Sequence, residues 1–442
     1  MGMNIDMQEA VEILRQYLRI DTTNPPGNEL SAAGFLAAIF KREGIPFTIH
    51  ESRPGRGNLV ATLKGDGTQR PVLLLNHMDV VGVERAKWSV DPFSGEIRDG
   101  YIWGRGTLDM KGMAIMQLMA MLKAKRAGFK LSRDIIFLAV ADEETNGTHG
   151  ARWMLENHPD EVAAEFVLNE GSFGILESAG IKYPYFPIST AEKVPLWLHI
   201  RTQGKAGHGS MPPDEHAVHR LVRLLKRLVA WNQKATLTPE MAALLAALGR
   251  NMDNPVRGWL LRHANLYPVW SLLKPVLRKV PVMRNMLANS VSINMLSGGH
   301  KVNVVPSRAE AFVDFRLLPD VNPQDFINQL KQRLRIGNDE IEVVVQESGS
   351  RSPTDTALFT ALSYAIRRTY PQAVVSPSLS AGFSDSRYFR NRGVVAYGII
   401  PVLLHPADLD AIHGHNERIE IDSFIKGIDI VYDTIKYLAG TR

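Results

Sequence analysis

Three adjacent carboxylates follow an uninterrupted apolar run in the first third of the chain. The run IIFLAVA, residues 135–141, is typical of a buried strand, and Asp142, Glu143 and Glu144 come directly after it. Ionised carboxylates repel one another, so several of them in one place need a compensating cation. These residues therefore predict a cation site at the end of this strand.

Two other apolar runs end in groups of the same kind. VLLLN is followed by His77 and Asp79, FVL is followed by Asn169 and Glu170, and a glycine-rich turn places Asp109 just before a helix. Sites in α/β sheets form at the carboxyl ends of strands. His77 and Asp79 are two apart on a strand and can point the same way, which suits a metal-binding histidine oriented by a carboxylate.

The chain has no cysteine, which excludes disulfides and thiolate ligands. The ligands available to a metal are then histidine and carboxylate, a set that suits Zn²⁺ and also Mn²⁺ or Co²⁺.

The elements that would position these residues alternate between strands and helices. Strands are expected near 47–52, 58–65, 71–81, 134–144 and 164–172, and helices near 31–44, 110–128 and 150–159. Short apolar strands between helices favour a sheet covered on both faces, so we expect an α/β fold with a mixed sheet flanked by helices.

The pattern changes near Thr190. Strands grouped around two amphipathic helices, at 216–231 and 322–335, suggest an α+β unit, and the α/β pattern returns after Thr354. We expect one α/β domain, residues 1–189 and 350–442, interrupted by an inserted α+β domain, residues 190–349.

Composition and charge restrict the class of protein. Of the 442 residues, 45% are hydrophobic and 22% are charged, as in ordinary globular proteins, and no apolar run reaches the length of a membrane span. The first helix lacks the features of a signal peptide, so a cytoplasmic location is expected. The net charge of +5 is concentrated in Asn254 to Ala309, which holds eight Lys or Arg and no Asp or Glu. No nucleic-acid-binding motif accompanies it, and we expect no nucleic-acid partner.

Eight short motifs occur in one order across almost the whole chain: NHMDVV, GRGTLDMKG, DEETNG, NEGS, GKAGHGSMP, NVVP, DFR and HGHNE. With these motifs the chain resembles the dinuclear-zinc M20 metallopeptidases, which include aminoacylases and carboxypeptidases. The resemblance implies that the α/β domain is catalytic and that the inserted domain is a lid and dimerisation domain.

The resemblance also implies two divalent metal ions, Zn²⁺ first, in one shared site. One ion would be held by His77 and Glu170 and the other by Glu144 and His413, with Asp109 bridging them. His415 is the alternative to His413. A cis peptide bond is expected between Asp109 and Met110.

Roles in catalysis follow from the same resemblance. Glu143 would be the general base that takes a proton from the attacking water and passes it to the leaving amine. Asp79 would orient His77, and Asp142 would be structural. His208 would reach the active site of a partner subunit in a homodimer and stabilise the oxyanion; on its motif alone it would be an ordinary turn histidine.

Three further residues match substrate contacts of that family. Asn303 and Arg316 would hold the substrate, and Arg316 could bind a carboxylate through two hydrogen bonds; its alternative is an exposed strand arginine. Gly382 would contact the substrate backbone, although the neighbouring Phe383 departs from the usual loop pattern.

An apolar and basic insert at about 236–288 has three interpretations. We expect its helices to pack on the lid domain with Arg and Lys in solvent, because Leu and Trp at helical spacing are usually core. Alternatively, part of it, including Trp259 and Trp270, lines the substrate entrance. Contact with an anionic membrane surface is the third interpretation, and we do not expect it.

The resulting functional expectation is a metal-dependent hydrolase of the amide bond of N-acyl amino acids, with bulky or long acyl groups if the insert lines the entrance. The alternatives are a carboxypeptidase or dipeptidase that acts on short peptides with a free carboxylate, the reverse condensation, and a catalytically silent binding protein on the same scaffold.

Overall fold

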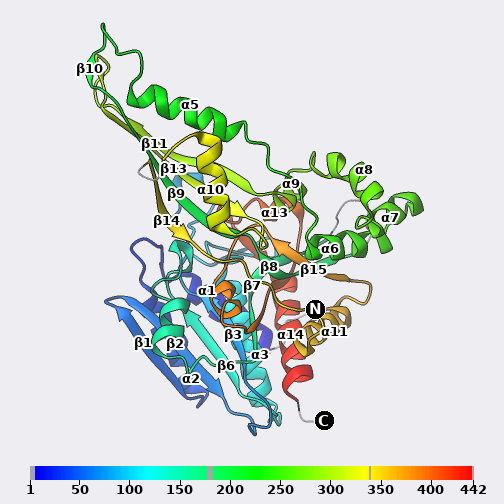
Figure 1. Cartoon of the computed structure of the whole chain (residues 1–442). Coiled ribbons are helices and arrows are strands. Elements are labelled where there is room, and N and C mark those ends of the chain that lie inside the picture. The colour runs from blue at the N-terminus through cyan, green and yellow to red at the C-terminus, as the bar shows by residue number, and fades with distance from the viewer. Residues whose placement is uncertain (1–4, 177–182, 338–339, 441–442) are drawn as a thin grey trace.

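A computed structural model describes residues 5–176, 183–337 and 340–440 of the chain. It contains two principal sheets with helices packed on them (Figure 1). The expected fold class is confirmed: a large mixed sheet flanked by helices is interrupted in sequence by a smaller α+β unit.

The large sheet has eight strands and is mixed. β3 is parallel to β6 and β7, and β7 is parallel to β16, whereas β1, β2 and β6 pair antiparallel. In spatial order the strands are β1 (Phe47–Arg53), β2 (Arg56–Leu63), β6 (Ile135–Val140), β3 (Val72–His77), β7 (Phe166–Ile175), β16 (Val395–Leu404), β8 (Tyr185–Glu192) and β15 (Val374–Ser380). Every residue of β3 and β6 is buried, as their unbroken apolar runs predict.

Helices cover both faces of this sheet. On one face the core includes apolar side chains of α1 (Ile5–Leu18), α2 (Glu29–Arg42), α3 (Lys111–Arg126), α11 (Ala357–Thr369) and α14 (Ile421–Ala439). On the other face a smaller cluster joins α4 (Ala151–Asn157) and α12 (Ser386–Arg390) to the sheet. Short strands β4 (Glu96–Arg98), β5 (Tyr101–Trp103) and β17 (Arg418–Glu420) form a separate sheet, and η1 (Arg85–Lys87) and α13 (Pro406–Leu409) lie in connections.

The second principal sheet is antiparallel and half covered. Its strands are β11 (Ser290–Gly298), β13 (Arg308–Leu317), β9 (Val194–Gln203) and β14 (Ile341–Gln346), in that order. Alternate residues of β13 are buried, and they pack in one core with α5 (Ala217–Val229) and α10 (Pro323–Leu334). A two-stranded ribbon, β10 (Gly207–His208) and β12 (Val304–Val305), lies at the end of this unit farthest from the large sheet (Figure 1).

Two strands of the large sheet, β8 and β15, were not predicted from the sequence. β8 contains Pro187, Ser189 and Thr190 and β15 is rich in Ser, yet every residue of β8 and four of the seven of β15 are buried. Hydroxyl contacts satisfy these polar groups: Ser172 Oγ lies 2.7 Å from Ser189 Oγ, and Tyr185 Oη lies 2.9 Å from Ser376 Oγ. Burial of a strand with hydroxyl groups depends on such partners, which only the fold supplies.

The insert forms four helices, α6 (Pro239–Arg250), α7 (Pro255–Arg262), α8 (Tyr267–Leu277) and α9 (Pro281–Leu287). The expectation that they pack on the lid domain is wrong in the main. Met241, Leu245 and Leu248 of α6 share a cluster with Tyr185 of β8 and Val374 of β15, at the edge of the large sheet. The outer helices project from the molecule (Figure 1).

Candidate metal centre

The predicted ligands meet where β3, β6 and β7 end or bend. His77 is the last residue of β3, and Glu143 and Glu144 begin the short 3₁₀ helix η2 (Glu143–Thr145) after β6. Glu170 lies in a bulge of β7, because Asn169 and Ser172 pair with consecutive residues of β16. Bulges re-aim side chains beside sites, and this one accounts for a ligand position inside a strand.

Asp109 stands between two histidines. Its Oδ1 lies 3.1 Å from Nε2 of His77, and its Oδ2 lies 2.9 Å from Nε2 of His413. Glu170 Oε1 is 3.6 Å from His77 Nε2, and Glu144 Oε2 is 3.3 Å from His413 Nε2. Two groups of candidate ligands thus share one carboxylate, His77–Asp109–Glu170 and Asp109–Glu144–His413. We call these five residues the ligand cluster.

His413, and not His415, occupies the position beside Asp109 and Glu144. The peptide bond between Asp109 and Met110 is cis, as the resemblance implies. The cluster is buried on the His77 side and open on the other: the His77 side chain is 1% exposed and that of His413 is 50% exposed.

Burial and the neighbouring charges shift the pKa values of the ligand cluster. Burial, together with the Asp109 carboxylate, raises the pKa of Glu144 to about 7 and that of Glu170 to about 8. Burial alone would lower the pKa of His77, but the Glu170 carboxylate and a hydrogen bond with Asp109 raise it well above its usual range. Hydrogen bonds with Asp109 and Glu144 raise the pKa of His413 to about 10.

The donor set fits two divalent cations. Oε1 of Glu143 and Oε1 of Glu144 are buried without a hydrogen-bond partner, so two carboxylate oxygens at the cluster are available to accept a hydrogen bond or to bind a cation. The ligand atoms are imidazole nitrogens and carboxylate oxygens, which bind Zn²⁺, Mn²⁺ or Co²⁺. A cation would offset the repulsion that raises these carboxylate pKa values.

Glu143 lies beside the ligand cluster and is nearly enclosed, with 7% of the residue exposed. Burial, and then the Glu170 carboxylate, raise the pKa of Glu143 well above its usual range. A carboxylate that is easily protonated, close to candidate metal ligands and free of other partners at Oε1, can accept a proton and return it.

Asp79 holds the segment that carries Glu143 and Glu144. Its carboxylate accepts hydrogen bonds from the backbone N–H groups of Glu143 and Glu144, each at 3.2 Å, and from Nδ2 of Asn24 at 2.8 Å. His77 Nδ1 lies nearer to the Asp79 carbonyl oxygen, 3.0 Å, than to its carboxylate, 3.5 Å. Asp79 therefore positions both the histidine and the acidic turn.

A buried charge network lies behind that turn. Arg56 Nη2 is 2.8 Å from Asp142 Oδ1 and 2.8 Å from Glu29 Oε1, and both acids are buried with it. Asp142 also accepts hydrogen bonds from Asn24 and from the backbone N–H of His149. The Asp142 carboxylate thus stabilises this loop through an ion pair and hydrogen bonds, consistent with the structural role expected for it. Sequence analysis missed Arg56, Glu29 and Asn24, which lie far away in the chain.

Glu417 holds the loop that carries Asp109. One of its oxygens accepts hydrogen bonds from the backbone N–H groups of Gly106, Leu108 and Asp109, and Arg105 Nη1 donates to the other. Glu417 is fully buried. In the sequence its only sign is its place in HGHNE, four positions after His413.

Two predicted site residues lie far from the ligand cluster. His208 ends β10 and Asn303 directly precedes β12, so both are at the β10–β12 ribbon at the outer end of the small sheet (Figure 1). Gly209 N donates to Asn303 O, and His208 Nδ1 lies 2.7 Å from Ser210 Oγ. Within one chain these residues do not join the site, so the role expected for His208 requires a second copy.

Arg316 and the loop of Gly382 do come together. Arg316 donates to Asp314 through Nε and Nη2, and its guanidinium lies 4.5 Å from the ring centroid of Phe383. Arg387 lies over the same ring at 4.3 Å. Phe383, which departs from the family pattern, thus provides an aromatic contact between β13 of the small sheet and the loop after β15.

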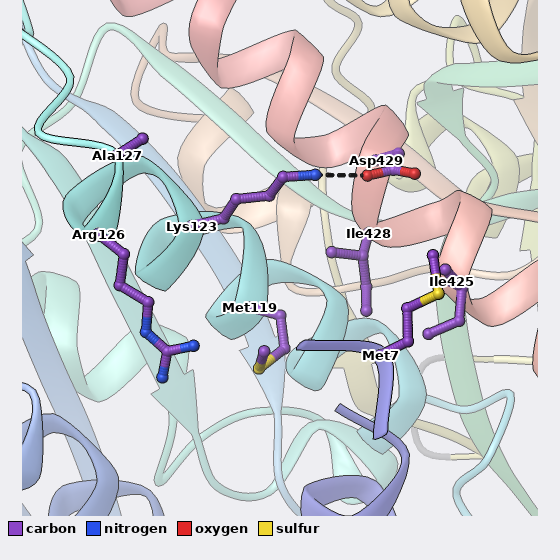
Figure 2. Close-up of a pocket in the computed structure, with 8 residues that line it drawn as sticks. All are labelled: Met7, Met119, Lys123, Arg126, Ala127, Ile425, Ile428 and Asp429. Atoms are coloured by element: carbon purple, nitrogen blue, oxygen red, sulfur yellow. Dashed lines mark hydrogen bonds and ion pairs between the residues drawn. The ribbon is translucent and has the colours of Figure 1, made fainter. Parts of the chain in front are cut away.

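Two other features lie apart from the ligand cluster. His50, His158 and Glu161 also gather: the two imidazole rings stack with centroids 3.6 Å apart, and Glu161 Oε1 lies 3.0 Å from Nε2 of His50 and 3.3 Å from Nδ1 of His158. A cavity of about 370 Å³ lies between α1, α3 and α14, beside the ion pair of Lys123 and Asp429 (Figure 2). Of the α3 residues that line this cavity, Met119 is the nearest to the start of the helix at Lys111. It lies eight residues from Lys111, which is roughly 12 Å along the helix axis.

Comparisons with known proteins agree with this geometry. The model of peptidase family M20/M25/M40 matches residues 73–437. An N-fatty-acyl-amino acid synthase/hydrolase of Xenopus tropicalis is 30% identical over 434 residues, 94% of this chain and 83% of that protein. Aminoacylase-1 of Mus musculus is 28% identical over 442 residues, 98% of this chain and 95% of that protein. The crystal structure of an M20 family metallo-carboxypeptidase of Sulfolobus solfataricus has the same fold, with a TM-score of 0.74, 20% identity and 99% of each chain covered.

Proposed function

Because this chain belongs to peptidase family M20/M25/M40 and is therefore a hydrolase of amide bonds, we propose that its substrates are N-acyl amino acids and that its cofactors are two Zn²⁺ ions. The observation that carries the proposal is the position of Asp109, whose two oxygens face Nε2 of His77 and Nε2 of His413 at 3.1 and 2.9 Å. A carboxylate so placed can bridge two ions, His77 and Glu170 holding one and Glu144 and His413 the other.

The ions would supply Lewis acidity when bound, polarising the scissile carbonyl and making water acidic near neutral pH. The rest of the chemistry belongs to the side chains. Glu143 accepts a proton from the attacking water at Oε1, which is buried and has no other partner. It then donates that proton to the leaving nitrogen. Asp79 keeps Glu143 in place through the backbone of η2.

Residues of the small sheet complete the site in this proposal. His208, exposed at the outer ribbon, would stabilise the oxyanion in the partner of a homodimer, and Asn303 would hold the substrate. Arg316 would bind the free carboxylate of the substrate. Its Nε and Nη2 already contact Asp314, so Nη1 is the atom left to meet the substrate, and Gly382 lies in the adjoining loop.

The substrate class rests on the relatives, one an aminoacylase and one an N-fatty-acyl-amino acid synthase/hydrolase, by their names. Action on dipeptides or as a carboxypeptidase needs the same groups and is the alternative, and so is condensation, the reverse reaction. A silent binding protein would be expected to have lost a ligand or the base, and here all are present and gathered.

Hydrolysis by metal-stripped enzyme refilled with Zn²⁺, Mn²⁺ or Co²⁺ tests the proposal. The panel would contain N-acetyl, N-lauroyl and N-aromatic-acyl amino acids, beside dipeptides. We expect turnover of N-acyl amino acids that metal restores, highest with Zn²⁺. Turnover of dipeptides alone would replace the substrate class, and no turnover with any metal would favour the binding-protein alternative.

A further inference from the structure

The outer helices of the insert expose an unusual amount of apolar surface. Of the 21 large hydrophobic side chains that are exposed among the described residues, eight lie between Val256 and Val282. Exposed apolar patches of this kind mark contact sites, whereas scattered single residues do not. We call the outward side chains of residues 255–284 the α7–α9 surface.

Helix α8 shows how this surface arises. Trp270, Leu273 and Leu277 pack against the cluster that contains Met241, Leu245 and Leu248 of α6. Outside that contact, Tyr267, Leu272 and Val276 of the same helix are 82%, 68% and 61% exposed. Three large apolar side chains of one short helix are therefore left in contact with solvent, which is the informative departure from ordinary burial.

Positive charge surrounds these apolar side chains. Arg257, Arg262, Lys279 and Arg284 are exposed on the same three helices or their connections. The sequence has no Asp or Glu from Asn254 to Ala309, so no acid of the segment itself offsets them. A partner of this surface must therefore be both apolar and negatively charged.

We propose that the α7–α9 surface docks on an anionic lipid bilayer, with Tyr267, Leu272 and Val276 in the interface and the basic side chains on lipid phosphates. Helices with apolar and basic side chains bind membranes in this manner. No described helix is long and apolar enough to cross a membrane. The sequence-based expectation that Leu and Trp of the insert are core holds for residues such as Leu245, Leu248 and Trp270, but Leu272 and Trp259 are exposed.

Two features favour lipid over a second copy of the chain. In a twofold contact the same patch meets itself, so the acid-free segment would face its own positive charges, which is repulsive. Helices α7 and α8 also project from the body of the molecule (Figure 1). A fluid bilayer can deform around such a projection. Binding of long-chain N-acyl amino acids, which collect in bilayers, would then be easier, but docking does not depend on that substrate class.

Vesicle sedimentation of the full-length, metal-loaded protein tests the docking. The probes are vesicles of phosphatidylcholine alone and of equal parts phosphatidylcholine and phosphatidylglycerol, at low salt. We expect binding to the anionic vesicles only. The charge variant Arg257→Gln/Arg262→Gln/Lys279→Gln should bind them roughly 100-fold more weakly, since each basic residue near an anionic surface contributes about a factor of five.

The apolar variant Tyr267→Ser/Leu272→Ser/Val276→Ser should bind at least about tenfold more weakly. Tyr364→Ser, at an exposed tyrosine of α11, is the matched control and should bind as the unaltered protein does. Circular dichroism establishes that each variant is folded.

The unaltered protein remaining in the supernatant, or equal binding by all variants, would overturn the proposal. So would a change from dimer to monomer in the apolar variant by sedimentation velocity, which would assign the surface to a second copy. None of these readouts depends on hydrolysis, so the test is independent of the proposed substrate.

Discussion

The ligand cluster and the α7–α9 surface are opposite departures from ordinary protein chemistry. In the first, negative side chains are gathered and buried, so that burial and mutual repulsion raise the pKa values of Glu144 and Glu170. In the second, apolar side chains such as Leu272 are left in water among positive charges. Each region is complete only with something that the chain does not contain, cations for the first and, in our proposal, an anionic bilayer for the second.

The difference lies in how each region is supported. Asp79, Arg56 and Glu417 hold the backbone around the ligand cluster through buried hydrogen bonds and ion pairs. The α7–α9 helices pack on one apolar cluster at their inner side, and their outward side chains are exposed to solvent. Substitutions in the first region should therefore affect chemistry and stability strongly, and substitutions in the second should leave both nearly unchanged.

Replacement of Asp109 should have the largest effect, because this carboxylate contacts both histidines. We expect Asp109→Ala to lose both metal ions and all measurable turnover. Metal analysis of the dialysed protein measures the first and an N-acyl amino acid assay the second. Asp134→Ala, at a carboxylate on the far end of β6 that pairs with Lys64, should keep both. Retention of two ions by Asp109→Ala would contradict the bridging role.

Glu143→Gln should separate proton transfer from metal binding. The amide keeps the shape of the side chain but cannot take up the proton, so kcat should fall roughly 1,000-fold, within the range of general acid–base catalysis. The metal content should not change. Glu156→Gln, at an exposed glutamate of α4, is the control. A near-normal kcat would remove Glu143 from its role.

Arg56→Met should reveal the cost of the buried network behind the site. It leaves Glu29 and Asp142 without their cation, and breaking a buried pair in this way destabilises a protein by about 3–5 kcal/mol. Urea denaturation measures the change. Adding Glu29→Gln should recover part of the loss, because burial already raises the pKa of Glu29 to about 7. If Arg56→Met is as stable as the unaltered protein, the network has no such role.

Leu272→Ser should give the smallest effect of all, and its comparison with Leu248→Ala sharpens the contrast within the insert. Leu248→Ala, in the cluster beneath α6 where the side chain is 3% exposed, should cost about 2–4 kcal/mol of unfolding free energy. Leu272→Ser, on the exposed face of α8, should change stability by less than about 0.5 kcal/mol. Thermal unfolding compares the two, and a large loss for Leu272→Ser would mean that its surface is covered in solution.

Much of the ligand cluster could be predicted from sequence because its signals are local. A polar group directly after an apolar strand identifies its own position, and this holds for His77, Glu143 and Glu144. The order of the motifs favoured His413 over His415 as the ligand, and the structure places His413 beside Asp109. The buried residues Asn24, Glu29 and Arg56 gave no such signal, since nothing near them in the chain distinguishes them from surface residues.

By itself the sequence determined which segments are apolar, where charges gather and which side chains can bind metal, because these are properties of each residue and its near neighbours. Only the tertiary structure decided what lies against them. It paired the serine hydroxyls that allow β8 and β15 to be buried, and it put α6 against the large sheet rather than on the small one. It also placed His208 far from the ligand cluster of its own chain and left one face of α8 uncovered. An apolar pattern shows that a face needs a partner, but the identity of that partner depends on contacts between residues that are distant in the chain.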